Sequence, residues 1–400
     1  MSLDSWQKKG GGENITATVD RNLTITFPTP LNKSLCNINK NIDAGVRYGS
    51  SSSPTTVEIW TTCGIIILII GTLGNVFTIV VLSRKNMRKK TTAMFLIYLA
   101  CVDTLALWVG LFPNWLAKSS VSLDIVSNVG CKLLAFLAYT PVQLSAWILV
   151  MVSSERVIAV YLPTKVNQIC AKRMAVCTLA VITFFICAIN LHMFWVNGVV
   201  DVRTSKCGVS KSECGVLKEY LYVWEVHLRW LDATIASILP FIIMLIANCM
   251  IIGKIVLHHT NQSKNKAKVT SMTIMLLVCN FAFIILTLPI VLLEIFKSQW
   301  YQHFKDEKHD DFFKEREDLE LHSTVCQMFQ YLNHAINFIM YCLAGPAFRR
   351  ELLCMMKENR YLRKIACCEN VNRVGEPSSN VTQSTTGNGT FARGTLTPVA

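Results

Sequence analysis

Long apolar stretches alternate with short polar ones along most of the chain. Seven of the apolar stretches are long enough to cross a bilayer as helices. They run from Trp60 to Leu82, Ala93 to Trp115, Leu133 to Val160, Met174 to Val196, Trp230 to Leu257, Val269 to Phe296 and Thr324 to Leu343. None shows the strict alternation typical of a strand, and in lipid a helix satisfies every backbone donor and acceptor within one segment. The pattern predicts an all-α fold, a seven-transmembrane helix bundle.

Polar segments on either side of the bundle divide the chain into three parts. Residues 1–59 are polar and rich in Gly, Asn, Ser and Thr, so we expect a mostly disordered segment there. Residues 60–346 form the transmembrane domain, and residues 347–400 form a short amphipathic helix and a disordered tail. Hydrophobic residues make up 52% of the 400 residues and charged residues 16%, as expected for a membrane protein.

The distribution of charge gives the orientation. Lys and Arg gather in Arg84–Lys90 after the first span and in Phe348–Leu352 after the seventh, and short cytoplasmic loops retain such cations. The loop from Lys297 to His322 instead holds eight acids against five Lys or Arg. We therefore expect a multi-pass protein of the plasma membrane with an extracellular amino terminus. Candidate glycosylation sites in that terminus are Asn14, Asn22 and Asn32.

The formal charge of +13 arises mainly from the cytoplasmic loops and the tail, which lie beside anionic lipid. It therefore gives no reason to expect a nucleic-acid partner. The lipid bilayer itself is the expected partner of this basic surface.

Sixteen cysteines occur, and about half lie inside spans, where a thiol acts as a small apolar side chain. Oxidised pairs are expected on the outer side, where Cys131, Cys207 and Cys214 lie, and the pairing is left open. Three further cysteines follow the seventh span and are either acylation sites or free thiols: Cys354, Cys367 and Cys368.

Polar side chains inside the spans are the main candidates for function, because burying them in hydrocarbon is costly. Asp103 lies in the middle of the second span, and Ser145 shares a face of the third with Arg156, eleven residues later. On the seventh span Asn333, Asn337 and Tyr341 lie four residues apart, on one helix face. Such groups can also serve only to stabilise the packing of one helix against another. Five of them directed toward one buried carboxylate favour a functional site.

These features, in this order, resemble the rhodopsin-like G-protein-coupled receptors from Trp60 to about Leu353. The matching residues are Gly74 and Asn75, Leu99 to Asp103, Cys131 at twenty-five residues before Arg156, Pro240, Pro289, "NFIMY" from Asn337 and "FRREL" from Phe348. The resemblance implies that an outside agonist moves spans five and six outward, so that Arg156 leaves Glu155 and a G-protein α subunit binds. The switch implied comprises Glu155, Arg156, Asn337 and Tyr341.

No Lys or Arg lies in the middle third of any span to neutralise Asp103. A buried carboxylate without a partner takes up a proton or recruits a cation. The resemblance implies a sodium ion that favours the inactive receptor, and no other cofactor is expected. Its ligands would be Asp103, Ser145, Asn333 and Asn337, with Asn75 close by.

The chain also departs from the family. Glu155-Arg156-Val157 replaces the usual Asp-Arg-Tyr and keeps the charge pair. Asn248 replaces a Tyr that usually meets the released arginine. Phe338 replaces the usual Pro of span seven, so we expect a smaller kink there.

Two positions that bind ligand in other receptor classes carry different residues in this chain, and this narrows the class of ligand. Ala138 replaces the Asp of amine receptors, and Tyr331 replaces the Lys of opsins, so amines and retinal are disfavoured. The candidate pocket residues are Trp108, Asn114, Tyr139, Arg229, Asp232, Glu294, Gln327 and Tyr331. This aromatic lining with both charge signs suits a short peptide, and the acidic loop favours a cationic one.

We therefore expect a neuropeptide receptor, resembling the invertebrate FMRFamide-like and thyrotropin-releasing-hormone-like branches. A chemosensory receptor for a small molecule and a seven-span transporter are the alternatives, although the paired interrupted helices typical of transporters are not seen. Enzymatic activity is not expected, because no nucleophile–base set or metal-ligand spacing occurs. The expected partners are the extracellular ligand, a heterotrimeric G protein, the lipid bilayer, and arrestin through the Ser/Thr-rich tail.

Overall fold

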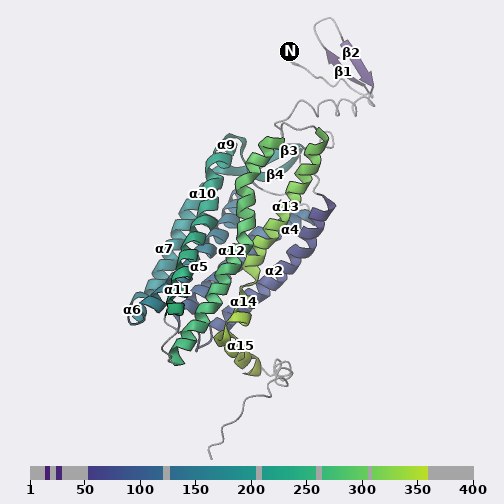
Figure 1. Ribbon diagram of the computed structural model, residues 1–400. Coiled ribbons are helices and arrows are strands. Elements are labelled where there is room, and N and C mark those ends of the chain that lie inside the picture. The colour runs from purple at the N-terminus through teal and green to yellow at the C-terminus, as the bar shows by residue number, and fades with distance from the viewer. Residues whose placement is uncertain are drawn as a thin grey trace, which may run out of the picture. The chain divides into compact units, whose positions relative to one another are not determined.

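The computed structural model describes residues 14–18, 24–28, 53–119, 127–203, 210–257, 264–304 and 309–358. The chain divides into two units, Met1–Glu351 and Leu352–Ala400. The first unit contains a bundle of long helices that lie side by side (Figure 1). The predicted all-α seven-helix architecture is confirmed.

The first four spans follow in chain order and are joined by short segments. They are α2 (Pro54–Leu82), the continuous run α3 (Thr91–Ala106), η3 (Leu107–Leu111) and α4 (Phe112–Lys118), then α5 (Asn128–Tyr161), and finally α7 (Lys172–Asn190) with α8 (Met193–Val196). The short helix α6 (Val166–Ile169) precedes the fourth span.

The fifth span is built from six short and long pieces. They are η4 (Lys218–Tyr220), α9 (Leu221–Val223), η5 (Trp224–Leu228), α10 (Arg229–Ala233), η6 (Thr234–Ile238) and α11 (Leu239–Leu257). The sixth span is α12 (Lys264–Phe304), the seventh is α13 (His309–Ala335) with α14 (Asn337–Ala344), and α15 (Pro346–Glu358) follows. Cys354 is exposed on α15, whereas Cys367 and Cys368 lie outside the described residues.

Within the described residues, six helical runs are long and apolar enough to cross a membrane. The seventh, α13 with α14, carries charged residues at its start and Asn333, His334 and Asn337 at its centre. Asn333, His334 and Asn337 are all buried, so they face the other helices and not the lipid. This position allows the span to carry polar residues. The span is thus helical as predicted, but it reads as less apolar than the other six.

The first span begins earlier than predicted, at Pro54 instead of Trp60. The Ser53 hydroxyl accepts a hydrogen bond from the Thr56 N–H, and Pro54 occupies the first turn, where its missing N–H costs nothing. The boundary drawn at residue 59 is therefore six residues too late for the helix.

Two of the spans contain π-helical turns directly before a proline. Phe112 and Leu239 each donate a backbone hydrogen bond to the carbonyl five residues earlier, on Leu107 and Thr234. Pro113 and Pro240 follow, and a proline ring would clash with the carbonyl four residues before it in a regular helix. The extra residue in each turn changes which side chains face the bundle interior.

The seventh span is interrupted at Ile336, between α13 and α14. We expected a smaller kink here because Phe338 replaces the usual proline. The interruption is present without the proline, and the residues on its two sides, His334 and Asn337, both bond to the Asp103 carboxylate. This side-chain pairing gives a physical reason for the break.

A glycine allows the first and seventh spans to approach closely. A Cβ at Gly71 would lie 2.8 Å from the Ala335 Cβ and 2.5 Å from Leu107 Cδ1. Around it lies an apolar cluster of buried residues from α2, η3 and α13: Trp60, Ile67, Leu68, Leu107, Leu111, Met328 and Ala335. Small residues at helix crossings allow this kind of backbone approach in membranes.

Two antiparallel hairpins were not predicted. β1 (Asn14–Thr18) pairs with β2 (Thr24–Pro28), and β3 (Asn197–Arg203) pairs with β4 (Ser210–Val216), with Val199 opposite Cys214. The segment before the first span therefore contains a hairpin, although it was expected to be mostly disordered. Of its sequons, Asn14 opens β1, and Asn22 and Asn32 lie outside the described residues.

Candidate functional site

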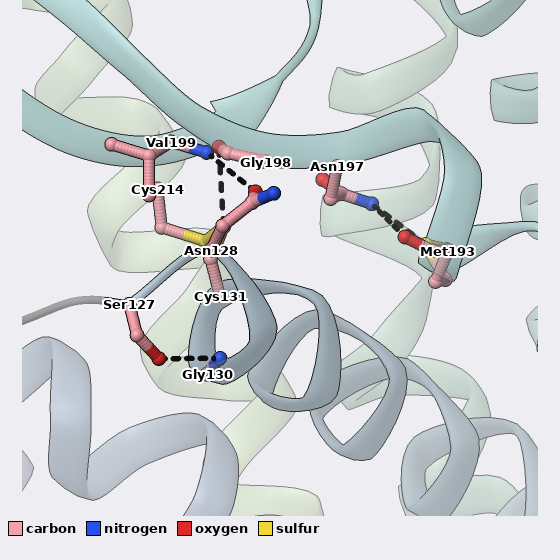
Figure 2. The surroundings of a disulfide bond; sticks show 9 residues. All are labelled: Ser127, Asn128, Gly130, Cys131, Met193, Asn197, Gly198, Val199 and Cys214. Atoms are coloured by element: carbon pink, nitrogen blue, oxygen red, sulfur yellow. Dashed lines mark hydrogen bonds between the residues drawn. A yellow bond between two sulfur atoms is a disulfide. The ribbon is translucent and has the colours of Figure 1, made fainter.

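One end of the bundle is covered by the β3–β4 hairpin, which a disulfide ties to the start of α5. Cys131 is bonded to Cys214, with 5.4 Å between their Cα atoms (Figure 2). The Ser127 hydroxyl accepts from the Gly130 N–H at 3.0 Å and begins α5, and Asn128 Oδ1 accepts from the Val199 N–H at 3.4 Å. The structure thus selects Cys214 from the two open partners. Cys207 lies outside the described residues.

Below this hairpin, a chain of polar side chains joins spans four, three and five. The Asn190 amide donates to Gln143 Oε1 at 2.7 Å, and the Gln143 amide donates to Asp232 Oδ1 at 2.6 Å. Gln143 and Asn190 are buried. These two amides fix the position of the Asp232 carboxylate, which is one of the predicted pocket residues.

Several other predicted pocket residues gather around the Tyr139 phenol. Asp232, Glu294, Arg229 and Tyr331 all lie within electrostatic reach of it, and its ring meets that of Trp224 edge-on at 5.9 Å. Arg229 and Asp232 lie on α10, between the π turns η5 and η6. Spans three, five, six and seven therefore meet in one region, to which spans five and six contribute both charge signs.

The Arg229 side chain is mostly buried, with 13% of its surface exposed. One of its terminal nitrogens pairs with Glu225 at 2.8 Å, one helical turn away. Its Nε and other terminal nitrogen are buried without a hydrogen-bond partner among the described residues. Buried donors without an acceptor are costly to leave unpaired.

The remaining predicted pocket residues, Asn114, Gln327 and Trp108, each donate a hydrogen bond to a residue outside the Tyr139 group. The Asn114 amide donates to its own helix, to the Gly110 carbonyl at 2.8 Å, and Gln327 donates to Ser323 at 3.2 Å. Trp108 does not join the Tyr139 group: its indole N–H donates to Thr72 at 3.2 Å and 46% of its surface is exposed. Trp108 was assigned to the pocket from its place near the outer end of a span, and the structure turns its indole toward Thr72 on α2 instead.

In the middle of the bundle, the fully buried carboxylate of Asp103 makes three side-chain hydrogen bonds. Oδ1 accepts from the Ser145 hydroxyl at 2.6 Å and pairs with His334 Nδ1 at 2.8 Å, and Oδ2 accepts from the Asn337 amide at 2.7 Å. The Asn75 amide donates to the His334 backbone carbonyl at 3.2 Å. Ser145 and Asn337 meet Asp103 as predicted, and His334 is an additional partner that we did not predict.

This arrangement does not fit the expected sodium site. Sodium binds lone pairs of oxygen, whereas His334 and Asn337 present nitrogen atoms to the carboxylate. No hydrogen bond joins Asn333 to Asp103 in the part of the chain that the structure describes. The Asp103 carboxylate is therefore provided with partners by the protein itself.

At the opposite end of the bundle from the disulfide, Glu155 and Arg156 form the predicted ion pair. The closest nitrogen–oxygen distance is 3.4 Å, and Arg156 also donates to the Thr92 hydroxyl on α3. Both side chains are buried, yet Arg156 Nε and Glu155 Oε2 have no hydrogen-bond partner among the described residues. Tyr341, also predicted for the switch, is buried on α14, and its ring contacts that of Phe348.

A second polar group on the same half of the bundle joins spans three, five and six. The Asn280 amide on α12 donates to Ser153 Oγ at 2.8 Å and to Asn248 Oδ1 at 2.9 Å. All three residues are buried. One amide thus ties α12 to both α5 and α11.

Five residues of these networks were missed by sequence reasoning: Gln143, Asn190, Ser153, Asn280 and His334. Each is a polar residue inside an apolar span, which is the signal that led to Asp103. A polar residue inside an apolar span could have marked these five residues as candidates. It does not show which residue on another helix each of them contacts.

Comparison with known proteins agrees with this geometry. Curated relatives include C-C chemokine receptor type 1 of Homo sapiens, 23% identical over 72% of this chain and 76% of the relative. The thyrotropin-releasing hormone receptor of Gallus gallus is 22% identical over 82% of this chain and 87% of the relative. The FMRFamide receptor of Drosophila melanogaster is 23% identical over 77% of this chain, but only 56% of the relative is matched.

The matching family decides between a receptor and a transporter. The model of the 7 transmembrane receptor (rhodopsin family) matches residues 74–341, which contain the polar networks around Asp103, Arg156 and Asn280. This family consists of receptors, not of transporters or enzymes, which confirms that the chain is not an enzyme. The chain is therefore a multi-pass membrane protein and belongs to the rhodopsin family of seven-transmembrane receptors.

Proposed function

We propose that this receptor binds a short, cationic neuropeptide outside the cell and activates heterotrimeric G proteins inside it. The observation that carries the ligand class is the Asp232 carboxylate, held by Gln143 at 2.6 Å within reach of Tyr139, Glu294 and Arg229. A fixed carboxylate attracts a basic side chain, while the unpartnered donors of Arg229 suit a carbonyl of the same ligand. Relatives named for FMRFamide, thyrotropin-releasing hormone and C-C chemokines support a peptidic ligand.

The proposed orientation places the disulfide end outside the plasma membrane. Disulfides form and persist in oxidising compartments, so the Cys131–Cys214 bond supports an extracellular position for β3 and β4. An amino terminus on the same side would allow glycosylation at Asn14, Asn22 and Asn32. Arg156 and α15 then face the cytoplasm, where we propose that arrestin binds the tail and that Cys354, Cys367 and Cys368 are acylated.

Activation is proposed to follow from outward movement of spans five and six. This movement would separate α12 from α5, so it must break or rearrange the Asn280 bridge. Arg156 would then exchange Glu155 for the G protein, and Asn337 and Tyr341 would rearrange with it. The resting contacts are polar and few, which allows a ligand of moderate differential affinity to shift the equilibrium.

A ligand panel tests the proposed function. Cells expressing the full chain are exposed to short amidated peptides, biogenic amines and small odorants, with calcium and cyclic-AMP readouts. Basic peptides are expected to give the most potent responses. A response to odorants alone would instead support the chemosensory alternative.

Asp232→Asn is expected to lower the potency of the most active basic peptide by about tenfold or more, because it removes a partly desolvated counter-charge. Glu58→Gln is a matched control, since Glu58 is an exposed acid on α2 that lies outside the acidic loop. Concentration–response curves at equal surface expression provide the measurement. Equal potency of native receptor and both variants would show that Asp232 does not contact the ligand.

Asn280→Leu is expected to raise basal G-protein activation without any ligand. Two hydrogen bonds, each contributing about 1 kcal/mol, hold α12 in the resting position, so basal activity should rise between about threefold and thirtyfold. Ser153→Ala removes only the contact to α5 and should give a smaller rise.

Ser154→Ala is the control for the Asn280 bridge, because the neighbouring Ser154 hydroxyl donates only to Val150 of its own helix among the described contacts. Basal nucleotide exchange at equal surface expression is measured for each variant. Basal activity of Asn280→Leu no higher than that of Ser154→Ala would show that the bridge does not hold the resting state.

A further inference from the structure

The partners of Asp103 leave an open question about how its charge is accommodated. The carboxylate is fully buried where α3, α5, α13 and α14 meet, and no Lys or Arg occurs in the middle third of any span. The family resemblance implied a sodium ion as its partner. The structure instead brings an imidazole against the carboxylate, at 2.8 Å.

We propose that His334 takes the place of a sodium ion as the internal partner of Asp103, so that the resting receptor is held without a bound cation. The contact links span two to span seven beside the interruption at Ile336. In this contact the His334 side chain, which belongs to the receptor itself, takes the place of an ion from solution.

Hydrogen-bond partners already surround the Asp103 carboxylate. A carboxylate oxygen and an imidazole nitrogen at 2.8 Å share a proton, whichever of the two atoms holds it. The Ser145 hydroxyl donates to the same oxygen, and Asn337 occupies the other. These three hydrogen bonds use both lone pairs of Oδ1 and one of Oδ2, so they leave a cation at most one carboxylate lone pair, fewer than a cation site needs.

The His334 side chain has little space in which to move. Its side chain is only 2% exposed, and its backbone carbonyl accepts from the Asn75 amide at 3.2 Å. The next residue, Ala335, lies where a Cβ on Gly71 would approach to 2.8 Å, so the backbone is held closely against α2. The imidazole is thus fixed by its surroundings, and a sodium ion bound to Oδ1 would have to displace it.

The effect of sodium on the thermal stability of the full receptor tests this proposal. Native receptor and His334→Ser are purified in detergent and unfolded in sodium chloride or in N-methyl-D-glucamine chloride at equal ionic strength, followed by tryptophan fluorescence. The native Tm is expected to agree between the salts within about 1 °C, whereas His334→Ser should gain about 3 °C or more in sodium. Adding Asp103→Asn to His334→Ser should remove the gain.

Two outcomes would overturn the proposal. A sodium-specific gain of several degrees in the native receptor would show that the cation binds despite His334. A His334→Ser receptor that is as insensitive as the native one would show that the imidazole is not what keeps sodium out. If His334→Ser does not fold, His334→Asn replaces it. No arm uses a ligand or a G protein, so the result is independent of the proposed function.

Discussion

Replacing Arg156 with alanine is expected to abolish G-protein activation while the affinity for an extracellular ligand stays within about threefold of native. Arg156 lies at the end of the bundle opposite the disulfide, where it contacts Glu155 and Thr92 and no predicted pocket residue. Its loss would remove the cation that the G protein is proposed to meet when spans five and six move outward. The ligand region around Asp232 should be unaffected.

The incomplete hydrogen bonding of this pair explains why it can act as a switch. The Arg156 Nη2 and Glu155 Oε2 atoms are 3.4 Å apart. Arg156 Nε and Glu155 Oε2 are buried without a hydrogen-bond partner among the described residues. Burying two charges is costly, and here the mutual attraction offsets that cost only in part. Glu155→Gln should therefore act in the opposite direction and raise basal activity.

Measurements on Arg156→Ala require surface expression matched to native, ligand binding on intact cells and nucleotide exchange in membranes. Arg173→Ala is the control, since Arg173 is an exposed arginine at the start of α7. Native-like nucleotide exchange by Arg156→Ala would contradict the proposed switch. Loss of binding together with signalling would indicate a structural role instead.

Replacing Cys131 or Cys214 with serine is expected to abolish most ligand binding at the cell surface. The disulfide closes a loop of 83 residues, and bonds that close loops of this size contribute about 4 kcal/mol in the chain-entropy description. It also fixes the β3–β4 hairpin over the start of α5, beside the region where the ligand is proposed to enter. Both single variants should have the same effect, because each removes the same bond.

The pairing can be checked on the native receptor as well. A membrane-impermeant maleimide should label Cys131 and Cys214 in intact cells only after reduction, which tests both the bond and its extracellular position. Cys177→Ser is the control variant, because Cys177 is an exposed free cysteine on α7. Peptide mapping that finds Cys131 as a free thiol at the surface would contradict this disulfide.

Hydropathy and motif order were sufficient for the architecture and the family. The seven apolar stretches all became helices of the bundle, because a lipid environment leaves a long apolar segment few alternatives to a helix. The sequence also predicted the ion pair between Glu155 and Arg156. Adjacent residues lie close together however the helices pack, so this pairing does not depend on the arrangement of the bundle. The early start of α2 at Pro54 was missed although the Ser53–Pro54 signal was present, because hydropathy alone set the boundary.

Within a single helix, periodicity correctly indicated which residues share a face. It indicated Ser145 and Asn337 as groups that could face Asp103, and the structure places each of them in hydrogen-bonding contact with that carboxylate. Trp108 was assigned to the pocket only from its place near the outer end of a span, and such a place does not show which way a side chain faces. The structure turns its indole toward Thr72 and leaves 46% of its surface exposed.

Contacts between helices were decided by the tertiary structure alone. The sequence gives no measure of how each helix is rotated and shifted against its neighbours, and a polar residue inside a span can face several partners. Packing at Gly71 brings His334 to Asp103, and the arrangement of α5, α11 and α12 gives Asn280 its two acceptors. The partner of Cys131 was likewise undetermined until the β3–β4 register placed Cys214 opposite Val199, beside the start of α5, because pairing depends on the distance between Cα atoms and not on spacing along the chain.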